Sequence, residues 1–198
     1  MLIIGASITA GMYADAGHDY RSVLIADLRG RGYSPVVQTW ARPGASVKAL
    51  QHFSAPSGMD VVVVQLAPND ATSSRPTPPD LFATDYSNLL GRLRAASPGA
   101  TLICLDAWSD PSKVNRLHVR VGVYDEAVQQ SCAAVQGHFI DLSSSYADAA
   151  YHGPPGRPTP HGRSDRFHPN DAGHAHLAGL VLADVPPPPP SAGGSRAL

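Results

Sequence analysis

Residues 60–67 contain the most informative stretch of the chain, Asp60-Val61-Val62-Val63-Val64-Gln65-Leu66-Ala67. Its apolar run is almost unbroken and consists mainly of β-branched residues. Alternating apolar and polar residues are typical of a strand with one face in water, whereas a continuous apolar run is typical of a strand buried on both faces. The stretch therefore predicts a central strand of a parallel sheet, with helices on both sides.

Segments of strand and helix character alternate on either side of this stretch. We expect further strands at residues 2–6, 33–40, 101–107 and 137–142, and helices at residues 19–31, 47–53, 79–96, 113–135 (with Gly122 as a possible break) and 170–184. Stretches rich in Gly, Pro, Ser or Thr predict loops at residues 68–79 and 143–165. This alternation predicts an α/β fold, a three-layer α/β/α sandwich around a mostly parallel five-stranded sheet.

Length and composition predict one globular domain. The chain has 198 residues, 43% of them hydrophobic, and a formal net charge of −1. We place the domain at residues 1–185 and expect a flexible, Pro-rich tail at residues 186–198. The charge argues against a nucleic-acid partner, and the lack of an apolar run of about 18 residues argues against a membrane span.

The N-terminus bears on the expected compartment. Met1 leads directly into the first expected strand, without the basic start or the cleavage site of a signal peptide. We therefore expect a cytoplasmic protein, or a secreted one if a leader has been removed.

The two cysteines, Cys104 and Cys132, lie in an apolar run and a helix-like segment. Free cysteine is among the most buried residue types, which favours two buried thiols, with a disulfide or a catalytic thiol as alternatives.

The carboxyl ends of the expected strands carry the residues that could do chemistry. Ser7 follows the first strand, Gly44 the second and Asn69 the third. Asp165 and His168 lie in the loop before the last helix. In an open parallel sheet, ligands bind outside the carboxyl ends of the strands. An Asp can hold one ring nitrogen of a nearby His while the other nitrogen faces a serine, so we expect the two ends of the chain to meet in one site.

These blocks resemble the SGNH hydrolase superfamily, also called the GDSL esterase/lipase family, and the resemblance covers residues 2–185. It implies the flavodoxin-like SGNH fold and a serine esterase that needs no cofactor. Ser7 would be the nucleophile, His168 the general base and Asp165 the residue that orients the base. The oxyanion hole would consist of the Ser7 and Gly44 backbone N–H groups and the Asn69 side chain. The expected reaction is hydrolysis of small or polar acyl esters through an acyl-enzyme.

The sequence departs from the family pattern at three positions. Ala6 stands where the family has the Asp of Gly-Asp-Ser, Arg42 replaces an Asn, and Ala67 replaces the Gly of Gly-x-Asn-Asp. None of the three has a direct catalytic role in the family. They motivate one alternative, a non-catalytic binding module on the same fold. A second alternative is an acyltransferase or thioesterase of a biosynthetic pathway, because the triad residues do not distinguish hydrolysis from transfer.

Histidines and arginines are numerous in the expected loops. The histidines between residues 152 and 176 lack the spacing and the companion ligands of a metal site, so we expect no metal there. The arginines that we expect around the site are Arg42, Arg75, Arg157, Arg163 and Arg166. Ordinary surface charge is the simpler interpretation. The alternative is substrate binding by Arg42, Arg75, Arg163 and Arg166, since Arg suits bidentate recognition of a phosphate or carboxylate group.

Overall fold

Five parallel strands form the central layer in the computed structural model, which describes residues 1–187. The strands are β1 (Leu2–Gly5), β2 (Gln38–Ala41), β3 (Val61–Gln65), β4 (Thr101–Leu105) and β5 (His138–Ile140), in the order β2-β1-β3-β4-β5. Gly5 at the end of β1 is in register with Ala41 of β2 and Gln65 of β3. The segments that follow these three strands therefore emerge side by side at one edge of the sheet.

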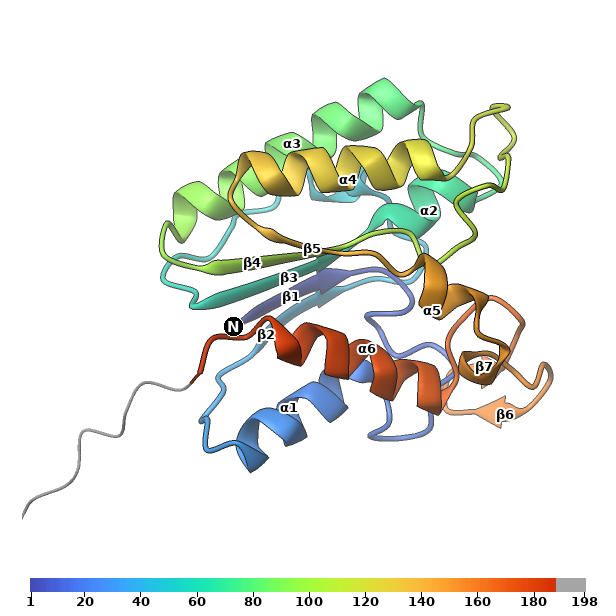
Figure 1. Ribbon diagram of the computed structural model, residues 1–198, viewed down its shortest axis with the longest axis horizontal. Helices are drawn as coiled ribbons and strands as arrows, with labels where there is room; N and C mark the ends of the chain where they lie inside the picture. The colour runs from blue at the N-terminus through green and yellow to red at the C-terminus, as the bar shows by residue number, and fades with distance from the viewer. Residues whose placement is uncertain (188–198) are drawn as a thin grey trace, which may run out of the picture.

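Helices cover both faces of the sheet (Figure 1). On one face α1 (Tyr20–Gly30) packs against α6 (Asp171–Ala183), and on the other α3 (Pro79–Ala96) packs against α4 (Gly122–Ala134). The shorter elements are α2 (Ala67–Thr72), α5 (Ser143–Ala147), the 3-10 helices η1 (Val47–Leu50) and η2 (Ala149–Tyr151), and the hairpin strands β6 (Pro158–Thr159) and β7 (Gly162–Arg163). The predicted three-layer α/β/α sandwich is confirmed.

The valines of β3 divide between two hydrophobic cores, because successive side chains of a strand point to opposite faces. Val62 and Val64 lie in the core that includes Phe82 of α3, whereas Val63 lies in the core that includes Leu24 of α1. All five side chains of β3, from Val61 to Gln65, are buried. The unbroken apolar run thus reflects helices on both sides of the sheet.

The loop predicted at residues 68–79 is wrong in its first part, where the chain forms α2. Pro68 occupies the first turn of this helix, where its missing N–H is not needed. The buried carboxylate of Asp70 accepts hydrogen bonds from the Val47 N–H at 2.9 Å and the Thr77 hydroxyl at 2.6 Å. These tertiary contacts hold a helix whose sequence has the composition of a loop.

The helix predicted from residue 113 begins only at Gly122. Residues 113–121 form a turn closed by an antiparallel bridge. Within it, Asn115 Oδ1 accepts hydrogen bonds from the backbone N–H groups of Leu117 and Val119 at 2.9 and 3.2 Å. Such local side-chain bonds compete with helical ones, which explains the difference.

Two further expectations differ from the structure. The strand predicted at residues 33–40 is reduced to β2, and the loop predicted at residues 143–165 contains α5, η2 and the β6-β7 hairpin. Pro35 has no N–H to donate to a neighbouring strand, which is one reason why strand pairing starts only after it.

The expectation of two free thiols is wrong, because Cys104 of β4 and Cys132 of α4 form a disulfide. Both residues are fully buried in the core between the sheet and α4. The bond therefore joins a central strand to the helix that covers it. The two residues are 28 positions apart, and their proximity depends on the return of α4 over the sheet.

The tail expected at residues 186–198 lies, from residue 188 onward, outside the described residues. Within residues 1–187, no helix has both the length and the apolar character needed to cross a membrane.

Candidate active site

Ser7 lies in a tight turn directly after β1. The turn is closed by a hydrogen bond from the Met12 N–H to the Ser7 carbonyl at 3.0 Å. Gly5 makes the turn possible, because a Cβ at this position would overlap the Thr9 side chain and lie 2.8 Å from the Gln65 carbonyl oxygen. The chain can therefore fold back against the strand end, where it presents Ser7 at the edge of the sheet.

Asp165 and His168 form a compact turn that reaches Ser7. Asp165 Oδ1 accepts hydrogen bonds from the backbone N–H groups of Phe167 and His168 at 2.9 and 2.8 Å. Asp165 Oδ2 lies 2.9 Å from His168 Nδ1, and His168 Nε2 lies 2.9 Å from Ser7 Oγ. One continuous chain of hydrogen bonds thus joins the three side chains, although Ser7 and His168 are 161 positions apart.

The charge of Asp165 fixes the direction of these bonds. Burial by itself raises the pKa of Asp165, but the hydrogen bonds from the His168 backbone and ring and from the Phe167 N–H outweigh it, so the pKa lies below its usual value. The ionised carboxylate can only accept, so His168 Nδ1 carries the proton and Nε2 can accept the Ser7 hydroxyl proton. The rings of Tyr13 and Phe167 pack edge-on around the imidazole at 5.0 and 5.2 Å between centroids.

Gly44 and Asn69 come from the segments that follow β2 and β3, on either side of Ser7. Gly44 follows β2 and has a φ of +79°, a left-handed conformation that suits glycine. Asn69 Nδ2, on α2 after β3, donates to the Ala45 carbonyl at 2.9 Å. Since β1 lies between β2 and β3, this bond spans the end of β1, where Ser7 lies. A side-chain amide has two N–H groups, so Asn69 keeps a second one for a ligand.

The structure brings all five residues of the predicted triad and oxyanion hole to one edge of the sheet. Asp165 is not needed as a helix cap, because Asn170 caps α6 by accepting the Gly173 N–H at 3.0 Å. The three departures from the family pattern do not interrupt the hydrogen-bond chain. Ala6 and Ala67, for example, are buried apolar residues that take no part in it.

Sequence reasoning missed an ion pair that joins the two halves of the site. Arg157 Nη1 donates to both carboxylate oxygens of Asp15, at 2.7 and 2.8 Å, and Arg157 Nη2 donates to the Tyr13 carbonyl at 3.3 Å. Tyr13 itself has a φ of 67°, which is unusual for a residue other than glycine. The partners are more than 140 positions apart in sequence, and no local pattern links them.

The buried His174 of α6 connects the segment after Ser7 to the start of α1. Its Nδ1 accepts the Tyr20 N–H and its Nε2 donates to the Met12 carbonyl, both at 3.3 Å. Burial lowers the pKa of His174 to about 4, so the ring is neutral near pH 7, as these two bonds require. His174 therefore supports the turn that carries Ser7. Among residues 1–187 no cluster of three His, Cys, Asp or Glu side chains is arranged to hold a metal ion.

The four arginines that we expected to bind substrate have different environments. The Arg42 guanidinium lies 5.1 Å from the centroid of the Trp40 ring, a cation–π contact. Arg163 donates to the Gly156 carbonyl at 2.8 Å within the segment that carries the β6-β7 hairpin. Arg75 and Arg166 are exposed. A role of these residues in substrate binding stays a prediction.

The comparison with known families decides which family the chain represents. The model of the GDSL-like lipase/acylhydrolase family matches residues 3–176, which is most of the chain. The chain belongs to this family. The resemblance inferred from the sequence blocks is thereby confirmed, and the protein is a hydrolase of carboxylic esters. No curated protein sequence matches the chain.

Solved structures agree with this GDSL-family assignment at the level of the fold. An acetyl xylan esterase shares 20% identity, with 94% of this chain and 100% of that chain covered and a TM-score of 0.69. A lipase/acylhydrolase from Enterococcus faecalis shares 19% identity, with 96% and 98% covered and a TM-score of 0.68. A variant of an acetyl-xylooligosaccharide esterase from Geobacillus shares 18% identity, with 93% and 92% covered and a TM-score of 0.68.

Proposed function

We propose that this GDSL-family protein is a serine esterase that hydrolyses small or polar acyl esters through an acyl-enzyme on Ser7. The observation that carries the proposal is the continuous hydrogen-bond chain from Ser7 Oγ through His168 to Asp165, with 2.9 Å at each of its two links. A nucleophile, a base and a group that orients the base are the parts that acyl transfer by a serine requires.

In the first half of the proposed reaction, His168 Nε2 takes the Ser7 hydroxyl proton as Ser7 Oγ attacks the ester carbonyl carbon. Asp165 holds the imidazole in the required tautomer and stabilises the imidazolium that forms. The tetrahedral intermediate then collapses. The bond to the alcohol oxygen breaks, His168 gives the proton to the departing alcohol, and Ser7 is left acylated.

In the second half, a water molecule takes the place of the alcohol. His168 removes a proton from the water, whose oxygen attacks the acyl carbon, and Ser7 leaves with the proton returned by His168. In both halves the oxyanion is met by the Ser7 and Gly44 backbone N–H groups and by the free N–H of Asn69. Each such donor stabilises the transition state by about 3–4 kcal/mol.

The substrate size is proposed from the family and from the names of the structural neighbours. Two carbohydrate esterases among them are described as acting on acetyl esters of xylan or xylooligosaccharides, which are small acyl groups on polar alcohols. We propose a substrate of this general kind, with a small acyl group or a polar alcohol part.

Turnover of 4-nitrophenyl acetate and butyrate tests the proposal. We expect the wild type to hydrolyse the esters and Ser7→Ala and His168→Ala to lose at least about 10³-fold in kcat. His161→Ala, which changes an exposed histidine of the hairpin turn, is the matched control and should keep full activity. No turnover by the wild type with either ester, or full activity of Ser7→Ala, would refute the proposal.

Addition of an alcohol acceptor distinguishes hydrolysis from the alternative, acyl transfer. A transferase would convert the acyl-enzyme to a new ester faster than to the acid.

A further inference from the structure

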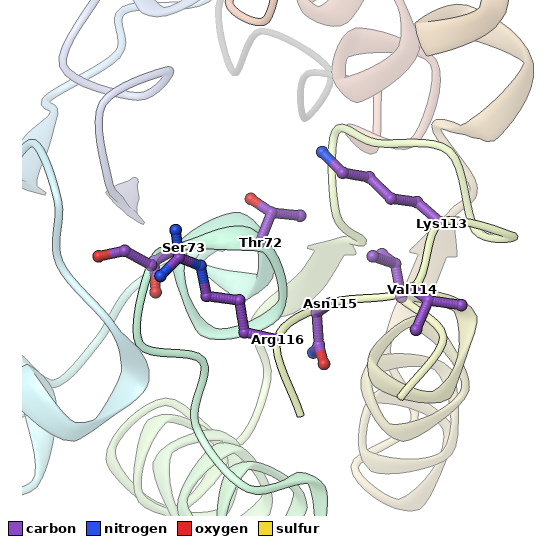
Figure 2. Close-up of a pocket in the computed structure, with 8 residues that line it drawn as sticks. Thr72, Ser73, Lys113, Val114, Asn115 and Arg116 are labelled. Carbon is purple, nitrogen blue, oxygen red and sulfur yellow. The ribbon is translucent and has the colours of Figure 1, made fainter. Parts of the chain in front are cut away.

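A pocket of about 360 Å³ lies between the carboxyl end of α2 and the turn of residues 113–121 (Figure 2). Most of its lining is polar or cationic, from Thr72, Ser73, Ser74, Lys113, Asn115 and Arg116. No carboxylate is among the lining residues. The proposed mechanism uses none of these side chains.

Asn115 fixes the turn onto α2. Its Nδ2 donates to the Ala71 carbonyl at 3.0 Å and to the Tyr124 hydroxyl at 3.1 Å. The same side chain also orders the turn through its Oδ1, so both ends of the carboxamide are engaged. Lys113 and Arg116 flank this anchored residue in sequence. In Figure 2 the Arg116 side chain extends toward Ser73, and the Lys113 side chain approaches Thr72 from the other side. The backbone that carries the two exposed cations is therefore held in place by the fold.

Neither cation forms an ion pair within the described part of the chain, although the charge of Lys113 acts at longer range on Asp110 and helps to lower the pKa of that carboxyl. The ion pairs of residues 1–187 involve other residues, so no carboxylate oxygen lies within 4.0 Å of Lys113 or Arg116. The carboxylate of Asp110, three positions before Lys113, is engaged by Ser112, whose N–H and hydroxyl donate to it at 2.8 and 2.7 Å. The Ser73 hydroxyl accepts the Arg75 N–H at 3.3 Å, which leaves its own proton free to donate. The pocket thus offers donors and positive charge.

The pocket also lies close to the proposed oxyanion hole. Ser73 caps the end of α2 and its N–H donates to the Asn69 carbonyl at 3.4 Å. Asn69 and Ser73 are one helical turn apart, which corresponds to roughly 6 Å along the axis. In the view of Figure 2, Thr72 lies between the charged ends of Lys113 and Arg116, and Ser73 lies beside the guanidinium. An ester whose carbonyl binds at Asn69 could therefore place another group in the pocket.

We propose that this pocket binds an anionic group, of the carboxylate or phosphate type, on the ester substrate, through Lys113, Arg116 and the Ser73 hydroxyl. The proposal rests on the proposed esterase function and adds a substrate class to it. Arg can bind such a group with two parallel hydrogen bonds, and Lys adds a compact positive charge. The cations that select the substrate are then Lys113 and Arg116, whereas Arg42 and Arg163 already contact other groups of the protein.

Two matched pairs of esters test the proposal kinetically. 4-Nitrophenyl hydrogen glutarate and 4-nitrophenyl pentanoate differ by a carboxylate on the acyl side, and 4-acetoxybenzoate and its methyl ester differ by one on the alcohol side. We expect the wild type to prefer the anionic member of one pair by about tenfold or more in kcat/KM, mainly through KM. Lys113→Gln/Arg116→Gln should lose this preference and keep its kcat/KM for the neutral esters within about twofold.

The matched control removes two exposed cations elsewhere. Arg29 and Arg31 lie at the end of α1, at the opposite edge of the sheet from Ser7, because a helix that connects parallel strands runs against them. Arg29→Gln/Arg31→Gln has the same net charge as the pocket variant and should keep the preference. An equal loss in both double variants, or no preference in either ester pair, would overturn the proposal.

A binding measurement separates this proposal from the esterase function itself. Ser7→Ala should bind glutaric acid monoanilide more tightly than pentananilide in calorimetry, and inorganic phosphate should compete with the monoanilide. The same measurements on Ser7→Ala/Lys113→Gln/Arg116→Gln should show equal affinity for both anilides. If the esters are not hydrolysed but this binding difference is found, the esterase proposal fails and the pocket stands. Equal binding of the two anilides by Ser7→Ala, together with equal kinetics for each ester pair, refutes the pocket.

Discussion

Arg157 and Asp15 form an ion pair in which one nitrogen, Arg157 Nη1, donates to both carboxylate oxygens, at 2.7 and 2.8 Å. Asp15 belongs to the segment that follows Ser7, and Arg157 to the loop that leads to Asp165. The Asp15 N–H also donates to Asp171 at the start of α6, at 2.8 Å. The segment with the nucleophile and the segment with the base are thus held to each other close to the point where they meet.

This relationship predicts that Arg157 acts as a positioning residue. Arg157→Gln should lower kcat by about tenfold, because the distance from Ser7 Oγ to His168 Nε2 is no longer fixed from both sides. The pair is exposed to solvent, which screens its charges, so Tm should change little. Steady-state kinetics and thermal unfolding of the same variant check both statements.

A double-mutant cycle gives the control for this prediction. Asp15→Asn and Arg157→Gln should each lower kcat, and the double variant should lose no more than the stronger single one. Arg157→Lys, which retains one charge, should recover part of the loss. Additive effects on kcat, or a loss explained by a lower Tm, would show that the pair has no positioning role.

Asn69 is predicted to act on the transition state. Asn69→Ala should lower kcat by about 10²–10³-fold with little change in KM, because the oxyanion develops only after the substrate has bound. The variant also loses the bond to the Ala45 carbonyl, so its Tm should be measured beside its kinetics. Thr84→Ala, at an exposed threonine of α3, serves as the control and should keep full activity. A change confined to KM would contradict the proposed role.

Asp106 predicts an unusual dependence of stability on pH. This residue is 2% exposed at the end of β4, and its burial, together with nearby Asp125, raises its pKa to about 9. In the unfolded chain its pKa is about 3.9. Between these two values the folded state binds more protons than the unfolded state, so this group lowers the free energy of unfolding progressively as the pH rises.

Asp106→Asn should remove this pH-dependent destabilisation. The amide oxygen can still accept the Leu142 N–H, which is bonded to Asp106 at 3.0 Å in the wild type. Denaturant unfolding at pH values of about 5 and about 8 should show a gain over the wild type that is larger at the higher pH. Asp110→Asn, at an exposed carboxylate, should show no such trend. A gain that is equal at both pH values would contradict the assignment.

The disulfide predicts a large contribution to stability. It closes a loop of 28 residues, for which loop entropy gives about 3–4 kcal/mol in the free energy of unfolding. Reduced protein should therefore unfold at a lower denaturant concentration than oxidised protein, and thiol titration in denaturant should find no free thiol before reduction. Two reactive thiols in protein kept without reductant would contradict the bond.

The disulfide also bears on the compartment. Because disulfides persist mainly in oxidising compartments, we propose such a compartment in place of the cytoplasmic location expected from the N-terminus.

The sequence contained enough information to predict the sheet, because the apolar run of residues 60–67 needs cover on both faces and the strand–helix alternation supplies it. Ser7, Gly44, Asn69, Asp165 and His168 could be named for a related reason, since each lies just after a strand or before a helix in a recognisable block. Features that depend on side-chain contacts between distant segments had no local signal. The Arg157–Asp15 pair and the Cys104–Cys132 bond are of this kind.

The errors in secondary structure have the same origin. The sequence of α2 looks like a loop, and the helix is held by bonds from Asp70 to Val47 and Thr77. The turn at residues 113–121 has helical periodicity, but Asn115 bonds its backbone in another conformation. These two segments also line the pocket that contains Lys113 and Arg116, so no local pattern in the sequence could single out these two cations.

Labelling with a fluorophosphonate tests the central claim most directly. If Ser7 is a nucleophile activated by His168, the probe should add once to the wild type, peptide mapping should place the adduct on Ser7, and His168→Ala should label at least about 10³-fold more slowly. An unlabelled wild type, an adduct on another residue, or equal labelling of His168→Ala would contradict the claim that Ser7, His168 and Asp165 form a working catalytic triad.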